Sequence, residues 1–190
     1  MVRIRPFMKC DEEAYVRVHN EGYSTEAWYG SLEKVLKFED FSELSYDATF
    51  LAEVNGKIVG LIDVKVRDKI GDIENLVVLP KHREKGVGKA LLEKAIEFLK
   101  DNVAKIRVET PIQSKKAIRF YLKNGFKHVA NAYLVESQNK SKLRPYLGHN
   151  FYFVRNRRYW IPDNKQMELL KKLKADFSVI GEFQVMVKTI

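Results

Sequence analysis

The sequence predicts an α/β fold, in which a mixed central sheet with parallel members is covered by helices. Two observations lead to this prediction. Between residues 72 and 135 strand patterns alternate with helix patterns, and a strand–helix–strand order makes the two strands parallel with the helix packed on the sheet. Upstream, Asn55-Gly56 joins two β-rich runs. This dipeptide favours a two-residue hairpin, so the sheet should also contain antiparallel strands.

The N-terminal part of the chain predicts a strand, two helices and the hairpin. Apolar and other residues alternate over residues 2–7, as in a strand with one buried face. Residues 11–23 repeat apolar side chains at helical spacing after an acidic start. A shorter helical pattern follows near residues 32–36. The hairpin then pairs residues 49–54 with residues 57–66.

The middle of the chain supplies the alternating segments. A strand over residues 72–79 stops at a proline, and residues 87–100 place apolar side chains on one helical face. Residues 105–110 alternate as a strand, and residues 114–123 form a helix that a glycine ends. Residues 126–135 return to a strand pattern.

The C-terminal part is less regular. Residues 137–142 are polar and are expected to form a surface connection. Residues 151–154 predict a strand, residues 164–174 an amphipathic helix and residues 183–187 a closing strand.

Composition narrows the class of protein. A chain of 190 residues with 45% hydrophobic content is expected to form one folded domain. Its net charge of +9 suits an anionic partner, whether polyphosphate, nucleic acid or membrane surface. The lone cysteine, Cys10, excludes an internal disulfide and a multi-cysteine metal site, and it is expected to be a small buried residue. Neither a secretory pattern nor a membrane-spanning run is seen, so we expect a soluble cytoplasmic protein without membrane contact.

A glycine-containing loop lies between the strand that ends at residue 79 and the following helix. A P-loop would need a glycine where Arg83 stands and a hydroxyl residue where Ala90 stands. A dinucleotide-binding fingerprint would need a glycine at Leu91. Both patterns therefore fail, and Arg-x-x-Gly-x-Gly remains, with Gly86 and Gly88 as its glycines.

This loop is suited to a pyrophosphate. The first N–H groups of a helix lack partners inside the helix and favour an anion, and glycines allow the phosphates to approach the backbone. Lys81, Lys85, Lys89 and the motif arginine add positive charge. Each also fits a solvated surface, and a plain glycine turn is the alternative interpretation of the loop.

A second motif, Ser114-x-x-Ala117-Ile118-x-Phe120-Tyr121-x-x-x-Gly125-Phe126, follows about thirty residues later. Together the two motifs resemble the GNAT superfamily of N-acetyltransferases over roughly residues 2–136. The resemblance implies the GNAT fold, with a parallel splayed strand pair in the sheet. It also implies a core over residues 1–136, followed by residues 137–190 as a C-terminal extension or a sheet-completing segment of the same domain.

The resemblance further implies acetyl-CoA as co-substrate, with no metal. The strand segment Leu76-Val77-Val78 would pair through its backbone with the pantetheine arm. Ser114 stands where the family commonly has asparagine, and a serine there can cap the helix. The residues implied to bind the pyrophosphate are Arg83, Glu84, Lys85, Gly86, Val87, Gly88 and Lys89.

The implied reaction is direct transfer of the acetyl group to an amine through a tetrahedral intermediate. The backbone N–H of Val78 would stabilise the oxyanion. Tyr121, near the cofactor sulfur, would protonate the leaving thiolate, and core packing is its alternative role. Glu109 is the first candidate base, because some N-terminal-amine acetyltransferases of this superfamily place a catalytic group twelve residues before the tyrosine. Glu74 is the second, and either carboxylate could instead pair with a neighbour such as Arg107.

Three matters stay open at this level. The acceptor can be a protein N-terminus, a lysine or a small amine, and the protein a monomer or a homodimer. Basic residues beside aromatics at 140–144 and 155–160 allow a nucleic-acid-binding module as an alternative function, and a non-catalytic acetyl-CoA sensor is a further one. Nucleic acid is the less favoured partner, because it leaves the paired motifs unexplained. The histidines show no metal-ligand spacing.

Overall fold

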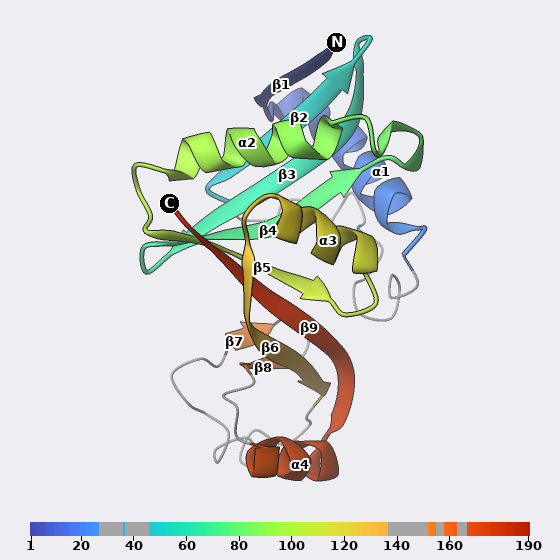
Figure 1. Ribbon diagram of the computed structural model, residues 1–190. Helices are drawn as coiled ribbons and strands as arrows, with labels where there is room; N and C mark the ends of the chain where they lie inside the picture. The colour runs from blue at the N-terminus through green and yellow to red at the C-terminus, as the bar shows by residue number, and fades with distance from the viewer. Residues whose placement is uncertain (27–35, 37–45, 137–151, 155–157, 163–166) are drawn as a thin grey trace. The chain divides into compact units, whose positions relative to one another are not determined.

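The computed structural model (Figure 1) describes residues 1–26, 36, 46–136, 152–154, 158–162 and 167–190. The chain divides into two compact units. The first consists of Met1–Val108 and Lys188–Ile190, and the second of Glu109–Val187. The predicted division into residues 1–136 and 137–190 describes the chain differently and stays a prediction.

The first unit is a sheet with helices. Its elements are β1 (Val2–Pro6), η1 (Lys9–Asp11), α1 (Glu12–Tyr23), β2 (Ala48–Val54), β3 (Lys57–Arg67), β4 (Ile70–Val78), η3 (Pro80–His82), α2 (Val87–Leu99) and the start of β5 (Lys105–Pro111). The strands lie in the order β1-β2-β3-β4-β5. Neighbours are antiparallel except β4 and β5, which are parallel. The predicted mixed sheet with a parallel pair is confirmed.

The hairpin of β2 and β3 turns where the sequence predicts. Asn55 has φ 50° and Gly56 has φ 73°, the left-handed values that a two-residue turn between right-twisted strands requires. The turn fixes the register, so that Leu51 lies opposite Leu61 on the sheet. Both of these leucines are fully buried.

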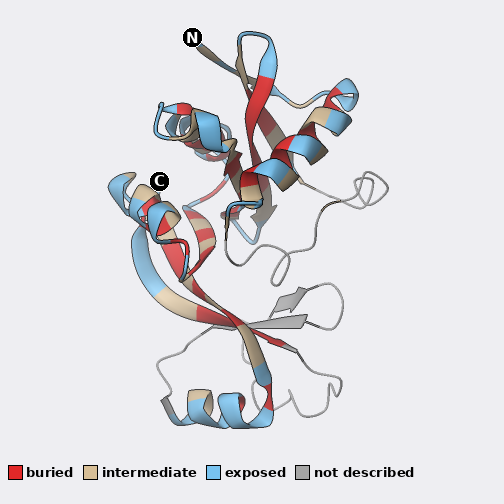
Figure 2. Cartoon of the chain, turned by 90° about the vertical axis from the view of Figure 1, so that its right-hand side faces the viewer, coloured by how far each residue is buried: buried red, intermediate tan, exposed pale blue. Residues whose placement is uncertain are grey.

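Helices α1 and α2 cover opposite faces of this sheet (Figure 1). Tyr15 of α1 belongs to the same core cluster as Leu51 and Leu61. The neighbouring residue Phe50 points to the other face, where its ring packs edge-on against Phe98 of α2 at 5.7 Å. Figure 2 shows the helices with stripes of buried and exposed residues. The predicted apolar face of α2 is buried at Val87, Leu91, Ala95 and Leu99.

The end of α1 packs very closely on β4. A Cβ atom added at Gly22 would lie 2.1 Å from Cγ1 of Val77. Real Cβ atoms do not approach other carbons so closely, so this position accepts only glycine without displacing the helix. The C-terminus of α1 is thereby held against the strand segment that the sequence assigns to the cofactor.

The second unit contains α3 (Lys115–Lys123), β6 (Lys127–Glu136), β7 (Tyr152–Val154), β8 (Arg158–Pro162), α4 (Met167–Asp176) and most of β9 (Ser178–Thr189). Its strands lie in the order β9-β6-β8-β7. Strand β9 is antiparallel to β6, and the register runs from Lys127 opposite Val187 to Glu136 opposite Ser178. Residues beyond position 136 thus supply the partners of β6.

Three details differ from the sequence prediction. Strand β8 was not predicted, because Arg157 and Arg158 interrupt the apolar pattern, and its pairing with β6 is a long-range contact. Strand β9 begins before residue 183, at Ser178. Cys10 is exposed rather than buried, since it lies in the single turn η1. The polar connection at 137–142, and all but Leu36 of the predicted helix at 32–36, lie outside the described residues.

Candidate active site

The loop between β4 and α2 has the backbone of an anion site. Gly86 is the N-cap residue of α2 and has φ 82°. A Cβ atom there would meet nothing within 4 Å, so the backbone lies open at this point. Helix α2 has 13 residues, and its first N–H groups have no partner within the helix. Glu84 also has a positive φ, 61°, so the loop changes handedness twice before the helix begins.

Charged side chains flank this loop in different ways. Lys85 and Lys89 are exposed, and Lys89 forms an i,i+4 ion pair with Glu93 at 3.7 Å. Such an exposed pair is weak and leaves the ammonium group available to an anion. Val87 is buried in the core and anchors the first turn. The loop therefore offers backbone donors together with mobile positive charge at its rim.

The side chain of Arg83 is turned toward helix α1. Its Nε donates to the carbonyl oxygen of Val78 at 2.9 Å, and Nη2 donates to the carbonyl oxygen of Gly22. Nη1 donates to Oγ1 of Thr25 at 3.1 Å and lies 3.6 Å from Oε1 of Glu26. A guanidinium is favourable at a helix C-terminus, where carbonyl groups lack partners. Arg83 thus ties the end of β4 to the end of α1.

The parallel ladder with β5 stops before β4 itself ends. The register with β5 runs from Ile70 opposite Lys105 to Ile73 opposite Val108, whereas β4 continues to Val78. The amide of Leu79 donates to the carbonyl of Val59 in β3 at 2.9 Å. Because strand amides alternate in direction, the N–H of Val78 points away from β3.

By the same alternation, the N–H and C=O groups of Leu76 point away from β3. The hydrogen-bonded ladder with β5 ends at Ile73, before the predicted segment Leu76-Val77-Val78. The side chain of Val77 is buried in the core with α1.

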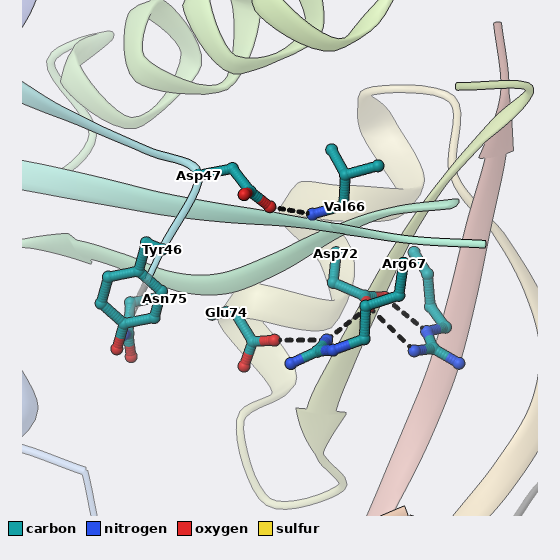
Figure 3. A network of polar contacts seen from close by, with 8 residues as sticks. Tyr46, Asp47, Val66, Arg67, Asp72, Glu74 and Asn75 are labelled. Carbon is teal, nitrogen blue, oxygen red and sulfur yellow. Dashed lines mark hydrogen bonds and ion pairs between the residues drawn. The ribbon is translucent and has the colours of Figure 1, made fainter. Parts of the chain in front are cut away.

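Glu74 occupies a bulge in β4. In the register with β3, Ile73 lies opposite Val64 and Asn75 opposite Asp63, so Glu74 has no partner. Its side chain is 32% exposed, and its Oε1 forms an ion pair with Arg67 at 2.6 Å (Figure 3). Ion pairing with a neighbour such as Arg107 was the alternative role predicted for Glu74. In the structure Glu74 does form an ion pair, and its partner is Arg67.

A second carboxylate beside it, Asp72, joins two arginines. Arg67 reaches Oδ2 of Asp72 at 2.6 Å, and Arg107 donates to Oδ1 at 2.6 Å and to Oδ2 at 3.0 Å. The carboxylate is nearly buried, with 8% of its side chain exposed. Arg107 is the neighbour that the sequence suggested for Glu109. Glu109 itself is half-buried on β5, at the first position of the second unit.

The second unit carries Tyr121. Its side chain is 5% exposed and packs edge-on against Phe120 and Phe126, each with ring centroids at 5.3 Å. Its hydroxyl makes no hydrogen bond within the described residues. Burial raises the pKa of Tyr121 above its ordinary value, so the phenol stays protonated. A buried, protonated hydroxyl without a partner in this part of the chain is suited to donate a proton to a ligand.

Ser114 begins helix α3 but does not cap it with its side chain. It is the N-cap residue and is buried, yet its hydroxyl makes no capping hydrogen bond. Its ψ of 60° lies outside the extended region that a capping residue normally adopts, which removes the hydroxyl from the first-turn N–H groups. The expected cap is therefore absent, whereas the helix start is where the sequence placed it.

A group of polar side chains buried against α1 was not predicted from the sequence. At its centre is Asp63 of β3, which is fully buried. The signal was available: Asp63 is the one acidic residue in the apolar run from Ile58 to Val66. An isolated carboxylate in a central strand requires donors from distant elements, and only the fold identifies them.

Two features are absent from the described part of the chain. No group of three or more His, Cys, Asp or Glu residues there could hold a metal ion. No helix among those described is long and apolar enough to span a membrane.

A family model described as the Acetyltransferase (GNAT) family matches residues 12–126. The chain belongs to this family. An uncharacterized N-acetyltransferase of Archaeoglobus fulgidus is 30% identical over 115 residues, covering 55% of this chain and 78% of that protein. Spermidine N(1)-acetyltransferase of Thermoplasma acidophilum is 30% identical over 118 residues, covering 60% of this chain and 73% of that protein.

A solved structure has the same fold. The PaiA N-acetyltransferase of Thermoplasma acidophilum, crystallised in complex with coenzyme A, matches with a TM-score of 0.58 at 20% identity. The match covers 100% of this chain and 99% of that chain. The mixed sheet with the parallel pair β4 and β5 therefore belongs to the GNAT fold.

Proposed function

We propose that this protein transfers the acetyl group of acetyl-CoA to an amine. The observation that carries the proposal is the free edge of β4 at Leu76 and Val78, which ends beside the open loop at Gly86. A peptide-like pantetheine arm can pair with strand donors and acceptors, and a pyrophosphate can accept hydrogen bonds from a helix N-terminus. Membership of an acetyltransferase family and a related fold crystallised with coenzyme A support the same ligand.

The chemical step needs an oxyanion donor and an acid. The N–H of Val78 points away from β3 and would stabilise the negative charge on the acetyl oxygen during attack. Tyr121 would protonate the departing thiolate, whose conjugate acid has a pKa near ~8.5 if it behaves like a cysteine thiol. Because Tyr121 stays protonated when buried, it can supply this proton at neutral pH.

The attacking nitrogen must lose a proton during the reaction. Glu109 would accept it, directly or through a water molecule, since a half-buried carboxylate can be both reachable and basic. Glu74 is the second candidate, and its carboxylate forms an ion pair with Arg67. No covalent acetyl-enzyme is proposed, because the lone cysteine lies in η1, outside both motifs.

The test is release of free thiol from acetyl-CoA in the presence of amines of three classes. Suitable probes are spermidine, a peptide with a free N-terminal alanine and an N-blocked lysine peptide. Amine-dependent thiol release and an acetylated product by mass spectrometry are expected with at least one of them. Acetyl-CoA binding with no transfer to any probe would favour a sensor. Salt-dependent RNA binding without acetyl-CoA binding would overturn the proposal in favour of a nucleic-acid module.

A further inference from the structure

Asp63 is a fully buried carboxylate held by three donors. Its Oδ2 accepts hydrogen bonds from the Tyr15 hydroxyl at 2.6 Å and from Nδ2 of Asn75 at 2.9 Å. Its Oδ1 accepts from the hydroxyl of Thr49 at 2.6 Å. No arginine or lysine is among these donors. A buried carboxylate whose hydrogen-bond donors are all neutral is costly to maintain, which calls for an explanation beyond packing.

The hydrogen bonds around Asn75 have a fixed direction. Asp63 can only accept while it is ionised, so the amide of Asn75 must turn its Nδ2 toward it. The same Nδ2 donates to the hydroxyl oxygen of Tyr46 at 3.1 Å, and Oδ1 accepts from the hydroxyl of Tyr23 at 3.1 Å. Because the hydroxyl oxygen of Tyr46 accepts from Asn75, the O–H proton of Tyr46 points away from Asn75. Tyr46 is hydrogen-bonded with Tyr15 as well.

These contacts form a line of hydroxyl groups from the surface to the carboxylate. Tyr46 is half-buried, Tyr15 is 1% exposed and Asp63 is 0% exposed. Figure 3 shows the ring of Tyr46 beside Asn75. The order of hydrogen bonds is Tyr46 to Tyr15 to Asp63, and only the first member is accessible from outside.

The line lies on the face of the sheet opposite the phosphate loop. Tyr15 belongs to α1, which covers one face, whereas the loop leads into α2 on the other. Asn75 directly precedes Leu76, the first residue of the free edge. If acetyl-CoA extends from the loop along this edge, an amine must approach the acetyl carbon from the side that the cofactor leaves open, which is the α1 face. This step rests on the proposed function.

We propose that Tyr46 and Tyr15 conduct a proton from the ammonium form of the acceptor to Asp63. The N–H bond of the ammonium breaks and its proton binds the oxygen of Tyr46. The proton of Tyr46 moves to Tyr15, and that of Tyr15 moves to Oδ2 of Asp63. The products are a neutral amine and a protonated Asp63, which later returns its proton to solvent by the same line. Glu109 acts after this, on the second proton, which the nitrogen loses during attack.

The electrostatics fit this role. Burial raises the pKa of Asp63 to about 6, while the hydrogen bonds from Thr49, Tyr15 and Asn75 and the charge of His19 oppose the rise. Among the described residues, the titratable groups that act on Asp63 are Tyr15 and His19, and Tyr46 acts on Tyr15. His19 is buried and packs against Tyr15 with ring centroids at 6.2 Å. Burial and the charge of Asp63 raise the pKa of Tyr15, so this hydroxyl passes a proton on without becoming a phenolate.

The test is the pH dependence of kcat/KM with saturating acetyl-CoA and the best amine probe, from about pH 5.5 to about pH 10. In the wild type the productive pair is ammonium and ionised Asp63, so kcat/KM should rise near pH 6 and then level off. In Asp63→Asn only the neutral amine can react. Activity at neutral pH should fall by about tenfold or more, and it should recover as pH approaches the pKa of the amine.

Two further variants separate conduction from structure. Tyr46→Phe interrupts the line and keeps the buried carboxylate, so its profile should match that of Asp63→Asn. Tyr23→Phe removes a hydroxyl from the same network but not from the line, so the shape of its profile should match wild type. If Asp63→Asn does not fold, the comparison of the Tyr46→Phe and Tyr23→Phe profiles is the test.

A Tyr46→Phe profile that keeps the wild-type shape, whether or not activity is lowered equally at every pH, would overturn the inference. The hydrogen bonds around Asp63 would then have only a structural role. Failure of the proposed function looks different, because wild-type protein would then release no thiol with any amine.

Discussion

Arg107 and Asp72 lie directly opposite each other in the parallel ladder of β4 and β5, and the guanidinium contacts both oxygens of the carboxylate. The Nε to Oδ1 distance is 2.6 Å, and the side chains are 14% and 8% exposed. The pair lies one register position before the last pair of the ladder, Ile73 with Val108. It therefore fastens the two strands just before their ladder ends.

Loss of this pair should destabilise the fold. Asp72→Asn leaves two guanidinium groups without their shared carboxylate, and removal of one partner from a buried pair typically costs about 3 kcal/mol. Urea denaturation should show a lower midpoint with an unchanged slope. Glu93→Gln, which removes an exposed ion pair with Lys89, is the control and should leave the midpoint unchanged. Equal midpoints for both variants would show that the Asp72 pair contributes nothing to stability.

The phosphate loop can be tested with two glycines of the same conformation. Gly86 and Gly56 have φ of 82° and 73°, and a Cβ atom at either would meet nothing within 4 Å. Gly86→Asp and Gly56→Asp should therefore incur similar strain of about 1 kcal/mol. Only Gly86→Asp places a carboxylate where a pyrophosphate should bind, so calorimetric titration should show at least ~10-fold weaker acetyl-CoA binding. Wild-type affinity in Gly86→Asp would remove the loop assignment.

Tyr121→Phe should lower kcat by about 10²-fold and change acetyl-CoA affinity little, because the substitution removes the proton donor and keeps the ring packing. Burial raises the pKa of Tyr121, so its protonated form is present throughout an assay near neutral pH. The pH–rate profile of the wild type should accordingly show no loss of activity caused by ionisation of Tyr121 up to about pH 9. Tyr133→Phe, at another buried tyrosine of the same unit, is the control. Equal kcat values in the two variants would contradict the assignment of Tyr121 as the acid.

Glu109→Gln should lower kcat/KM and remove the dependence of the rate on ionisation of that carboxylate, while acetyl-CoA affinity stays the same. The substitution keeps the size of the side chain and removes its charge, so the change reports on basicity. Glu74→Gln is the comparison, and with Glu109 as the base it should have the smaller effect. A pH–rate profile of Glu109→Gln that superimposes on wild type would exclude Glu109. A large effect of Glu74→Gln alone would transfer the role to Glu74.

Local patterns predicted most of the elements. The hairpin at Asn55-Gly56 and the helix that begins at Val87 follow from turn chemistry and apolar spacing, which act over a few residues. Strand β8 was missed because its pairing with β6 is a contact between residues about 26 positions apart. The exposure of Cys10 was missed because composition gives a tendency to burial, whereas a single exposed turn decides the actual environment.

The sequence by itself determined the family motifs, the mixed sheet and the glycine loop, because backbone conformation and amphipathic periodicity are encoded locally. Only the tertiary structure decided how the charged and polar side chains are used. It directs Arg83 to the end of α1, pairs Asp72 with Arg107, and buries Asp63 among hydroxyl groups from α1 and β2. The physical reason is that a charge takes its partner from whatever the fold brings within a few ångströms. For Asp63 the partner nearest in the chain, Asn75, is 12 residues away.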